Sequence, residues 1–590
     1  MLTASPPTAP SSPSPDVREP RPRSWRPRLG GGGGAIAPGL LLISVVLIGP
    51  PLFFLIWTSL TPGPGIRLIR PFSFDAYLKL FGSDATFFQS LWQTAVFALG
   101  SSAGALVLGS VLAWLVARTD VKGKWLVYLA VFLSFAIPGM IEVIGWILLL
   151  GRGAGQVNVL LHDLFGVGVT FPIQSIEGMI FVQSLSLAPV VFLLLVGPLR
   201  MMDKSLEESA VMCGASRLRC FRRITLPLLL PSLLSVLILV IIRAVQAFEV
   251  PLFLGQPAGV RTLTTEVYNG LHESFIPDYS RSAAFGVILM VALLFAIWYY
   301  QRATRDALKF VTVTSRGFRP QSIALGRLGW LGTVLIALVT LFYVAPVLAV
   351  LLESFRSGVR QPGQSLLSGL SLENYRAMWR QPDLLGAVTN SAVIGLLSAT
   401  LVVVLCLAAA WAIGRTKSRG RAALSHVLSL PLAIPGTVLG LAVLVTFVYL
   451  PIPVYGTVAI FVIAYVVHFA PYGLRYVQPA LAQIHPHLEE SAQVSGARMG
   501  AVFWRILTPL LIPALLGSWL YVFFHSFRDL SVAAMLYTAD TNVVSTLVMS
   551  MWQEGSLNVL SSFGVLISML SIAVAAGAYT YGRRLGVTVE

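Results

Sequence analysis

The chain has few charged residues for its length. Only 11% of its 590 residues are Asp, Glu, Lys or Arg, whereas 56% are hydrophobic and the mean hydropathy is +0.80. A water-soluble protein carries charge on about a quarter of its residues. The composition therefore excludes a soluble globular protein and indicates an all-α protein that crosses a membrane many times.

Cysteine and lysine are also scarce, and each scarcity excludes a function. The three cysteines, Cys213, Cys220 and Cys406, lack the spacing of a metal site, and we expect no disulfide framework. None of the six lysines lies in a Gly-x4-Gly-Lys-Ser/Thr phosphate loop. No set of His, Asp, Glu or Cys residues converges as in a membrane enzyme. We expect neither catalysis nor a bound cofactor, and the sequence assigns no metal ligands.

Long apolar runs recur along the chain. A helix needs roughly 20 apolar residues to cross a hydrocarbon core of about 30 Å. The runs predict twelve spans, near residues 36–60, 89–117, 125–151, 176–200, 226–255, 283–301, 328–352, 386–413, 424–450, 455–478, 509–536 and 560–582.

The formal charge of +16 has two possible explanations, a nucleic-acid partner or an uneven distribution of cations across a membrane. Most of the Lys and Arg residues fall in loops on one side of the predicted spans, for example Arg217 to Arg223, Arg302 to Arg327 and Arg415 to Arg421. This is the bias of cytoplasmic loops. It predicts both termini in the cytoplasm, contact with membrane lipid, and no nucleic-acid partner.

The N-terminal segment contains no apolar run of its own. Residues 1–35 are rich in Pro and Ser, then in Arg, and end in a run of Gly. We expect a disordered, basic cytoplasmic tail, not a cleaved signal peptide.

The sequence is duplicated internally. Glu-Glu-Ser-Ala at Glu207 returns 282 residues later at Glu489, and Ala-Ile-Pro-Gly at Ala136 returns 297 residues later at Ala433. Arg118-Thr119 likewise returns at Arg415. The duplication predicts two six-helix repeats, 36–303 and 328–590, joined by a cytoplasmic linker at 304–327. Because six spans is an even number, both repeats insert in the same direction.

A polar cassette follows the fourth predicted span of each repeat. In the first repeat, a short amphipathic helix starts near Lys204 and carries Glu208. Gly214 then permits a left-handed turn, and Pro227 fits the first turn of the next span, where a missing N–H costs nothing. The pattern predicts a helix–turn–helix unit attached to a membrane-spanning helix. The alternative is a plain basic loop against lipid headgroups.

The two cassettes resemble the signature of permease subunits of ATP-binding-cassette importers with the type I fold. Matching residues are Glu208, Ala210, Gly214, Ile224 and Pro227 in the first repeat, and Glu490, Ala492, Gly496, Ile506 and Pro509 in the second. The sequence departs from the signature at Ser209, Ser491 and Thr508. The resemblance implies coupling helices that dock on two copies of an ATP-binding subunit, where ATP is hydrolysed. It also implies an extracytoplasmic solute-binding protein and a bacterial inner membrane.

Fusion of both repeats in one chain is similar to the ferric-iron permeases and their thiamine-carrying relatives. The phrases that carry this resemblance begin at Ala247, Leu263 and Met551. It implies Fe³⁺ as the transported solute, with thiamine, polyamine and phosphonate as alternatives. A secondary transporter driven by an ion gradient would share the topology, but it would not explain the duplicated cassettes.

Charged residues inside spans are costly and mark candidate positions on the solute pathway. The clearest in the first repeat are Glu142, Arg243 and Glu249, and pairing between helices is the alternative role. The second repeat offers His468, Arg475, Arg528 and Asp529. Pro138 and Pro435 each remove a backbone donor, so they either break a span at the cavity or kink it for packing.

The predicted outer segment 266–279 is rich in oxygen ligands, including Glu266, Glu273 and Asp278. Such ligands suit hard cations. A docking surface for the binding protein is the other interpretation of this segment.

Overall fold

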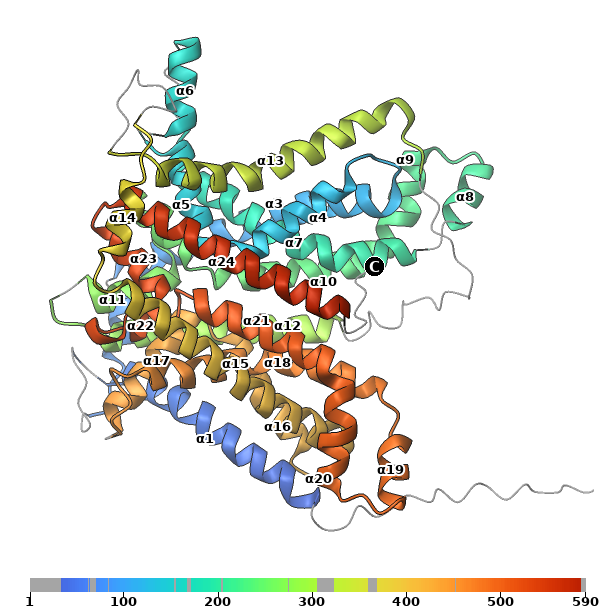
Figure 1. Cartoon of the computed structure of the whole chain (residues 1–590), viewed down its shortest axis with the longest axis vertical. Helices are drawn as coiled ribbons and strands as arrows, with labels where there is room; N and C mark the ends of the chain where they lie inside the picture. Colours follow the sequence, from blue (N-terminus) through green and yellow to red (C-terminus); the bar gives the residue numbers. More distant parts are fainter. Residues whose placement is uncertain are drawn as a thin grey trace, which may run out of the picture.

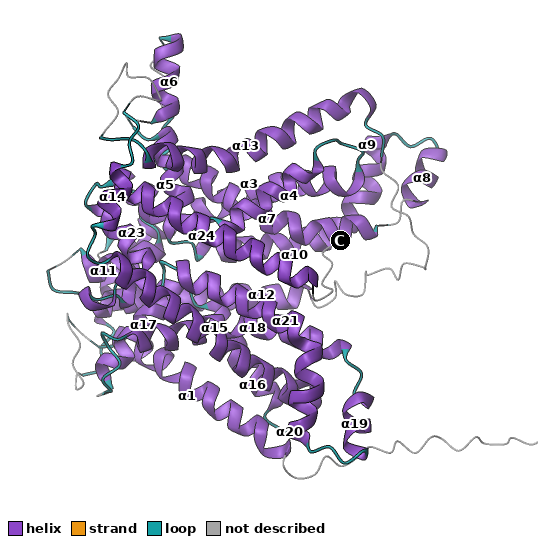
Figure 2. Ribbon diagram, in the orientation of Figure 1, coloured by secondary structure: helices purple, strands orange, loops and turns teal. Residues whose placement is uncertain are grey.

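A computed structural model describes residues 33–584 except 62, 64–70, 83, 153–154, 167–170, 203–204, 274, 305–322, 359–368, 417 and 451. Within these residues the regular structure is helical, and the β contacts are two isolated bridges (Figure 2). The predicted all-α fold is confirmed. The predicted tail lies largely, and the predicted linker mostly, outside the described residues.

Ten helices of the described part are long and apolar enough to cross a membrane. They are α1 (Gly33–Ser59), α3 (Ala85–Arg118), α7 (Ile176–Met201), α10 (Leu226–Val245), α12 (Tyr279–Thr304), α13 (Gly329–Ser354), α15 (Leu384–Arg415), α18 (Val458–Gln483), α21 (Thr508–Arg528) and α24 (Leu557–Arg584).

Two further apolar segments are sharply bent. α4 (Lys124–Ala136) meets α5 (Gly139–Leu150) at 109°, and the segment of α16 (Arg421–Ser429) and η6 (Leu430–Ala433) meets α17 (Gly436–Tyr449) at 110°. Counting each bent pair as one span gives the predicted twelve. The bends lie at Pro138 and Pro435, so these prolines break the helices instead of merely kinking them. Ile137 and Ile434, which precede them, are extended, since a following proline disfavours helical backbone.

The predicted spans 226–255 and 509–536 are too long. α10 ends at Val245 and α21 at Arg528, and the apolar residues that follow form short separate elements. After α10 these are η2 (Pro251–Gly255), η3 (Gln256–Ala258) and α11 (Leu263–His272). After α21 they are α22 (Ala533–Leu536), η8 (Ala539–Thr541) and α23 (Val544–Gln553). A hydrophobic run therefore overestimates a span when the chain turns back while still buried.

The remaining short elements lie near the ends of the long helices. They are α2 (Asp75–Gly82), α6 (Gln156–Phe165), α8 (Ser205–Met212), α9 (Arg217–Cys220), η1 (Phe221–Thr225), η5 (Gly326–Leu328), α14 (Glu373–Trp379), α19 (His487–Val494), α20 (Met499–Val502) and η7 (Phe503–Leu507).

The first helix of each repeat packs on the bent span of the other repeat. α1 contacts α16 and α17, and α13 contacts α4 and α5. Within each repeat, α3 packs along α7 and α15 along α18. The exchange of first helices interlocks the two repeats around a shared centre.

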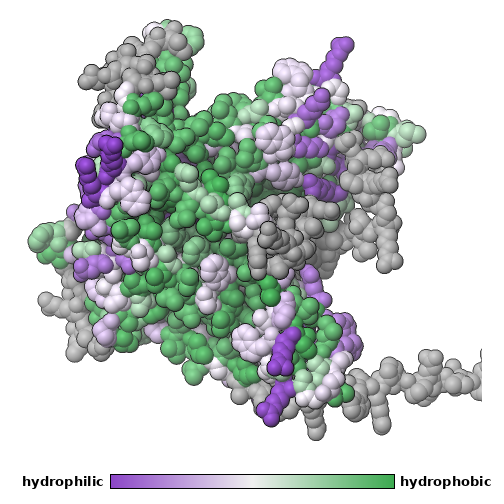
Figure 3. Space-filling model, in the orientation of Figure 1, coloured by the Kyte–Doolittle hydropathy of each residue, from purple (hydrophilic) through white to green (hydrophobic). Residues whose placement is uncertain are grey.

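The long helices run in one general direction, so the molecule has two distinct ends (Figure 1). The cassette helices α8 and α19 lie at one end, near the finish of α24, whereas α6, α11 and α14 lie at the other. Hydrophobic side chains cover the middle of the visible face, and hydrophilic ones gather at both ends (Figure 3). This surface suits a bilayer with each end in a polar environment.

Glycine brings α3 close to α7. A Cβ added at Gly109 would lie 2.5 Å from the Val191 Cβ and 2.7 Å from the Ala188 carbonyl oxygen. Small residues allow membrane helices to approach in this way.

We therefore expect Gly109→Leu to destabilise the protein by about 1–3 kcal/mol through overpacking. The matched control is Gly197→Leu on α7, where a Cβ meets nothing within 4 Å. Thermal unfolding of both variants in detergent checks this. Equal stability of the two variants would contradict the close packing of α3 on α7.

Candidate functional site

Each cassette is a short helix, a left-handed glycine and a second helix that leads into a span. In the first, α8 ends at Met212 and Gly214 has φ +82°. In the second, α19 ends at Val494 and Gly496 has φ +88°. The turns close in the same way, with Ala215 N–H donating to the Ala210 carbonyl at 2.9 Å and Ala497 N–H to the Ala492 carbonyl at 3.0 Å. The predicted turn is thus confirmed in both repeats.

The span after each cassette begins earlier than Pro227 and Pro509. Helical backbone runs from Arg217 through η1 into α10, and from Met499 through η7 into α21. One wide turn precedes each proline, in which Leu226 N–H reaches Phe221 and Thr508 N–H reaches Phe503. The prolines lie inside continuous helices, because a wider turn tolerates the missing donor. The Thr508 hydroxyl also donates to the Phe503 carbonyl at 2.9 Å.

A buried ion pair holds the first cassette. Arg118, the last residue of α3, donates to Glu207 of α8 at 2.5 Å and to the Met202 carbonyl at 3.0 Å. The other Glu207 oxygen accepts a 2.6 Å hydrogen bond from Thr225 in η1. Glu207 thereby joins the end of α3 to both arms of the cassette.

The second cassette is held by the equivalent ion pair, and we call the Arg–Glu pair at each cassette its clamp. Arg415, the last residue of α15, donates to Glu489 at 2.7 Å and to the Ile484 carbonyl at 2.5 Å. Trp411 adds a 3.4 Å hydrogen bond to Glu489. The duplicated Arg-Thr pair was visible in the sequence, but its contact with the first Glu of each Glu-Glu dipeptide was missed. Two repeats that conserve the same charged pair are the signal that could have revealed it.

The residues that carry the family resemblance lie mostly on the open side of the cassettes. Glu208 is exposed, and half-buried Glu490 pairs with His487 at 2.9 Å. Met212 is 88% exposed and Val494, at the equivalent position, is 89% exposed. Val211 on α8 and Leu488 on α19 are exposed as well. The matching alanine and isoleucine residues in the two cassettes are half-buried, namely Ala210, Ile224, Ala492 and Ile506.

A cavity of about 320 Å³ lies between the repeats. Residues around both helix breaks line it, as do the ends of α10 and α21 and the middle of α7 and α18. Its polar and charged lining residues include Glu142, Gln183, Ser186, Arg243, Gln246, Glu249, His468, His525, Arg528 and Asp529. All three charged pathway candidates of the first repeat therefore meet in one cavity, although Arg243 and Glu249 are too far apart for a helical pair.

Glu142 is a buried carboxylate of the cavity with few hydrogen-bond partners. It is 7% exposed, its Oε2 lies 3.4 Å from the Ser186 hydroxyl, and its Oε1 has no hydrogen-bond partner within the described part. Glu249 lies directly over Gly139 at the first break, where a Cβ would collide with its carboxylate. Both carboxylates are therefore positioned by the break at Pro138.

The cations of the cavity are held differently. Arg243 lies over the Tyr472 ring, with its Cζ 5.5 Å from the centroid. Arg528 donates to backbone carbonyls at the first break. Asp529 accepts hydrogen bonds from the Ser531 hydroxyl and the Val532 N–H, both at 2.8 Å. Of the second-repeat candidates, Arg475 is exposed and lies outside the cavity lining.

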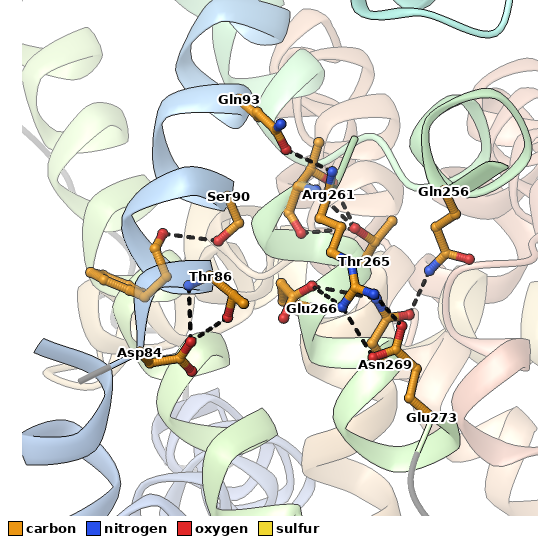
Figure 4. Close-up of polar contacts among 12 residues, drawn as sticks. Asp84, Thr86, Ser90, Gln93, Gln256, Arg261, Thr265, Glu266, Asn269 and Glu273 are labelled. Atoms are coloured by element: carbon orange, nitrogen blue, oxygen red, sulfur yellow. Dashed lines mark hydrogen bonds and ion pairs between the residues drawn. The ribbon is translucent and has the colours of Figure 1, made fainter. Parts of the chain in front are cut away.

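The oxygen-rich segment 266–279 is committed to an ion-pair network (Figure 4). Glu266 on α11 binds Arg281 at 3.2 Å and Arg261 at 3.5 Å, and Arg281 also binds Asp84 at 3.1 Å. Burial raises the pKa of Glu266, and the two arginines act in the opposite direction. Across the described residues, no three His, Cys, Asp or Glu side chains form a group able to hold a metal ion. The cation-ligand interpretation of this segment is not supported, since arginines already occupy Glu266.

The chain matches a family model over residues 105–307 and 403–584, once in each repeat and over more than half of its length. That model describes the binding-protein-dependent transport system inner membrane component. The chain belongs to this family, the permease subunits of ATP-binding-cassette importers, and it is a multi-pass inner-membrane protein.

Named relatives carry different solutes. The chain is 28% identical over 450 residues, 75% of its length, to the ferric transport system permease protein FbpB of Actinobacillus pleuropneumoniae. That alignment spans 64% of the relative's length. The chain is also 27% identical over 281 residues to the sulfoquinovosyl glycerol transport system permease protein SmoG of Agrobacterium fabrum. This alignment covers 46% of the chain and 89% of the relative.

A solved structure is also similar. The crystal structure of a bacterial ABC transporter involved in the import of the acidic polysaccharide alginate aligns with 18% identity and a TM-score of 0.35, covering 49% of this chain and 98% of that one. A TM-score this low adds nothing to the family assignment.

The clamp generates a prediction with a neighbouring control. Glu207→Ala removes one partner of a buried pair and should destabilise the protein by about 3 kcal/mol. Glu208→Ala, one residue along, removes an exposed carboxylate and should leave stability unchanged within about 0.5 kcal/mol. Thermal unfolding in detergent compares them. Equal loss in both variants would mean that Glu207 does not hold the cassette.

Proposed function

We propose that the chain is the permease subunit of an ATP-driven solute importer, with its solute pathway between the two repeats. The observation that carries the proposal is the pair of equivalent cassettes at one end of the helices. The first presents Val211 and Met212, and the second presents Leu488 and Val494, as exposed apolar residues on a unit continuous with a long helix. Two equal units suit two copies of one partner.

The partners follow from this arrangement. Two copies of an ATP-binding subunit dock on the cassettes, through Glu208, Ala210 and Gly214 and their counterparts Glu490, Ala492 and Gly496. A solute-binding protein delivers the solute at the opposite end, consistent with a family of binding-protein-dependent transport systems. In this proposal the cassettes and both chain termini are cytoplasmic, the repeats span 36–303 and 328–590, and a basic tail at 1–35 precedes them.

The pathway runs through the central cavity. Glu142, Arg243 and Glu249 are its candidate contacts with the solute, and the breaks at Pro138 and Pro435 shape its walls. An unpaired carboxylate is expensive in a membrane interior, which favours a role for Glu142 in transport. The cavity is small and contains three carboxylates, Glu142, Glu249 and Asp529.

Ferric iron is the solute we propose, on the likeness to the ferric transport permeases. Thiamine, polyamine and phosphonate are the alternatives. Sugars are a further alternative, because sugar permeases are also similar to this chain. Uptake assays with this panel, using the complete transporter in proteoliposomes, identify the solute. Uptake that follows an ion gradient without ATP would instead indicate a secondary transporter.

The docking role is tested at the turn glycines. Gly214→Asp and Gly496→Asp place a charge where a partner must fit, so we expect each to reduce ATPase binding and solute uptake at least tenfold, because burying an unpaired charge costs several kcal/mol.

Asparagine at the same positions is the matched control. It has the shape of aspartate and tolerates positive φ, but it carries no charge. A Cβ at either glycine meets nothing within 4 Å inside the protein, so abundance should survive. Full uptake and ATPase binding by both Asp variants would overturn the docking assignment.

Glu142→Gln tests the pathway. We expect uptake to fall at least tenfold, equivalent to about 1.4 kcal/mol, with normal amounts of protein in the membrane. Glu353→Gln is the control, because Glu353 is also buried but pairs with Arg356 at 3.0 Å and lies outside the cavity lining. Wild-type uptake by Glu142→Gln would exclude Glu142 from the pathway.

A further inference from the structure

The helix that follows each cassette ends against the broken span of the other repeat. Arg528, at the end of α21, donates through Nη1 to the Phe135 carbonyl at 2.7 Å and the Ile137 carbonyl at 3.1 Å. Gln246, just after α10, donates through Nε2 to the Leu432 carbonyl at 3.1 Å. These acceptors lie within three residues of Pro138 and Pro435.

The two contacts occupy equivalent positions in the two repeats. Gln246 and Arg528 are 282 residues apart, the same offset that separates the cassettes. Phe135 and Leu432 are 297 residues apart, the offset of the Ala-Ile-Pro-Gly motif. A fortuitous hydrogen bond would not satisfy both offsets. The contact is therefore a reciprocal feature of the pseudo-twofold arrangement.

The acceptors are groups that the fold leaves without helical donors. A helix end exposes its last carbonyls, and the breaks create such ends near the central cavity. Arg528 and Gln246 satisfy these carbonyls from the opposite repeat. Of the five residues in these contacts, all but Leu432 line the central cavity.

Each contact is also the far end of a continuous rod. From Arg217 to Val245, helical backbone connects the first cassette to Gln246, and from Met499 to Arg528 it connects the second cassette to the other contact. The wide turn and the prolines, the sites where helices kink, lie in the cassette end of each rod, and no proline follows Pro231 or Pro513, so displacement of the membrane-embedded part of the rod must move the contact.

We propose that Arg528 and Gln246 are positioning residues that link each cassette to the break in the opposite repeat. This proposal rests on the proposed function. The link transmits the movement of one ATPase subunit to the part of the cavity wall that the opposite repeat forms. The two links differ in strength. Arg528 makes two charge-assisted hydrogen bonds, whereas Gln246 makes one neutral bond, and charge-assisted bonds are the stronger kind.

The experiment compares Arg528→Met and Gln246→Met in proteoliposomes with the ATP-binding subunit and the solute-binding protein. Methionine keeps bulk but cannot donate. We expect both variants to bind the ATPase and hydrolyse ATP, with solute imported per ATP falling at least tenfold for Arg528→Met and less for Gln246→Met. Arg528→Gln places glutamine at both equivalent positions. We expect this variant to recover part of the import per ATP that Arg528→Met loses.

Arg475→Met is the matched control, because Arg475 is exposed on α18 outside the cavity lining. It should import at the wild-type ratio. An unchanged ratio in both Arg528→Met and Gln246→Met would overturn the proposal. If those variants keep the ratio while Gly214→Asp abolishes ATPase binding, the proposed function stands and only the links fail. If Gly214→Asp is also harmless, the proposed function fails.

A second measurement decides the matter if the methionine variants do not reach the membrane. Cysteines at Gln246 and Leu432, in a chain with its three native cysteines replaced, are joined by a cleavable bifunctional thiol reagent. Because Gln246→Cys removes the hydrogen bond, we expect the double-cysteine variant to import less solute per ATP, the crosslink to restore the ratio, and its cleavage to lower the ratio again. A ratio that neither the cysteines nor the crosslink changes would overturn the proposal.

Discussion

Backbone polar groups in a membrane interior must find partners inside the protein, and the rest of this structure depends on how the chain meets that demand at two prolines. Pro138 and Pro435 interrupt apolar helices and free carbonyl groups at membrane depth, near the central cavity. Side chains from the opposite repeat satisfy them. The breaks thus create the central cavity and at the same time require the two repeats to meet there.

Buried charge follows a related rule at the cassettes. Arg118 and Arg415 end long helices with their guanidinium groups almost fully buried, and each finds a glutamate of the adjacent cassette together with a backbone carbonyl. A guanidinium group can serve several acceptors at once because its donors are fixed in one plane. The first cassette is therefore held to the end of α3 and, through Thr225, across its own turn, whereas the second is held to α15 through Arg415 and Trp411.

Much of the fold was predictable from the sequence, because apolar length, glycine at the turns and internal repetition are local signals. The left-handed Gly214 and Gly496 and the breaks at Pro138 and Pro435 belong to this class. The ends of α10 and α21 were not predictable from hydropathy, since the residues beyond them remain buried after the chain turns. The assembly of Glu142, Arg243 and Glu249 in one cavity also depends on tertiary contacts. So do the Arg118–Glu207 clamp and the arginines around Glu266, which sequence spacing does not encode.

Equivalent positions around the cavity carry different residues: Arg243 corresponds to His525, Glu249 to Ser531, and Gln246 to Arg528. Two unlinked copies of the first repeat, paired as a homodimer, would enclose four glutamates and two arginines. The fused chain encloses three carboxylates and two arginines. Covalent fusion fixes the stoichiometry of the halves, so each can diverge without the hazard of self-pairing. On the axis that relates the two repeats, a solute therefore meets an electric field with a component parallel to the membrane plane, which cancels in a symmetric dimer.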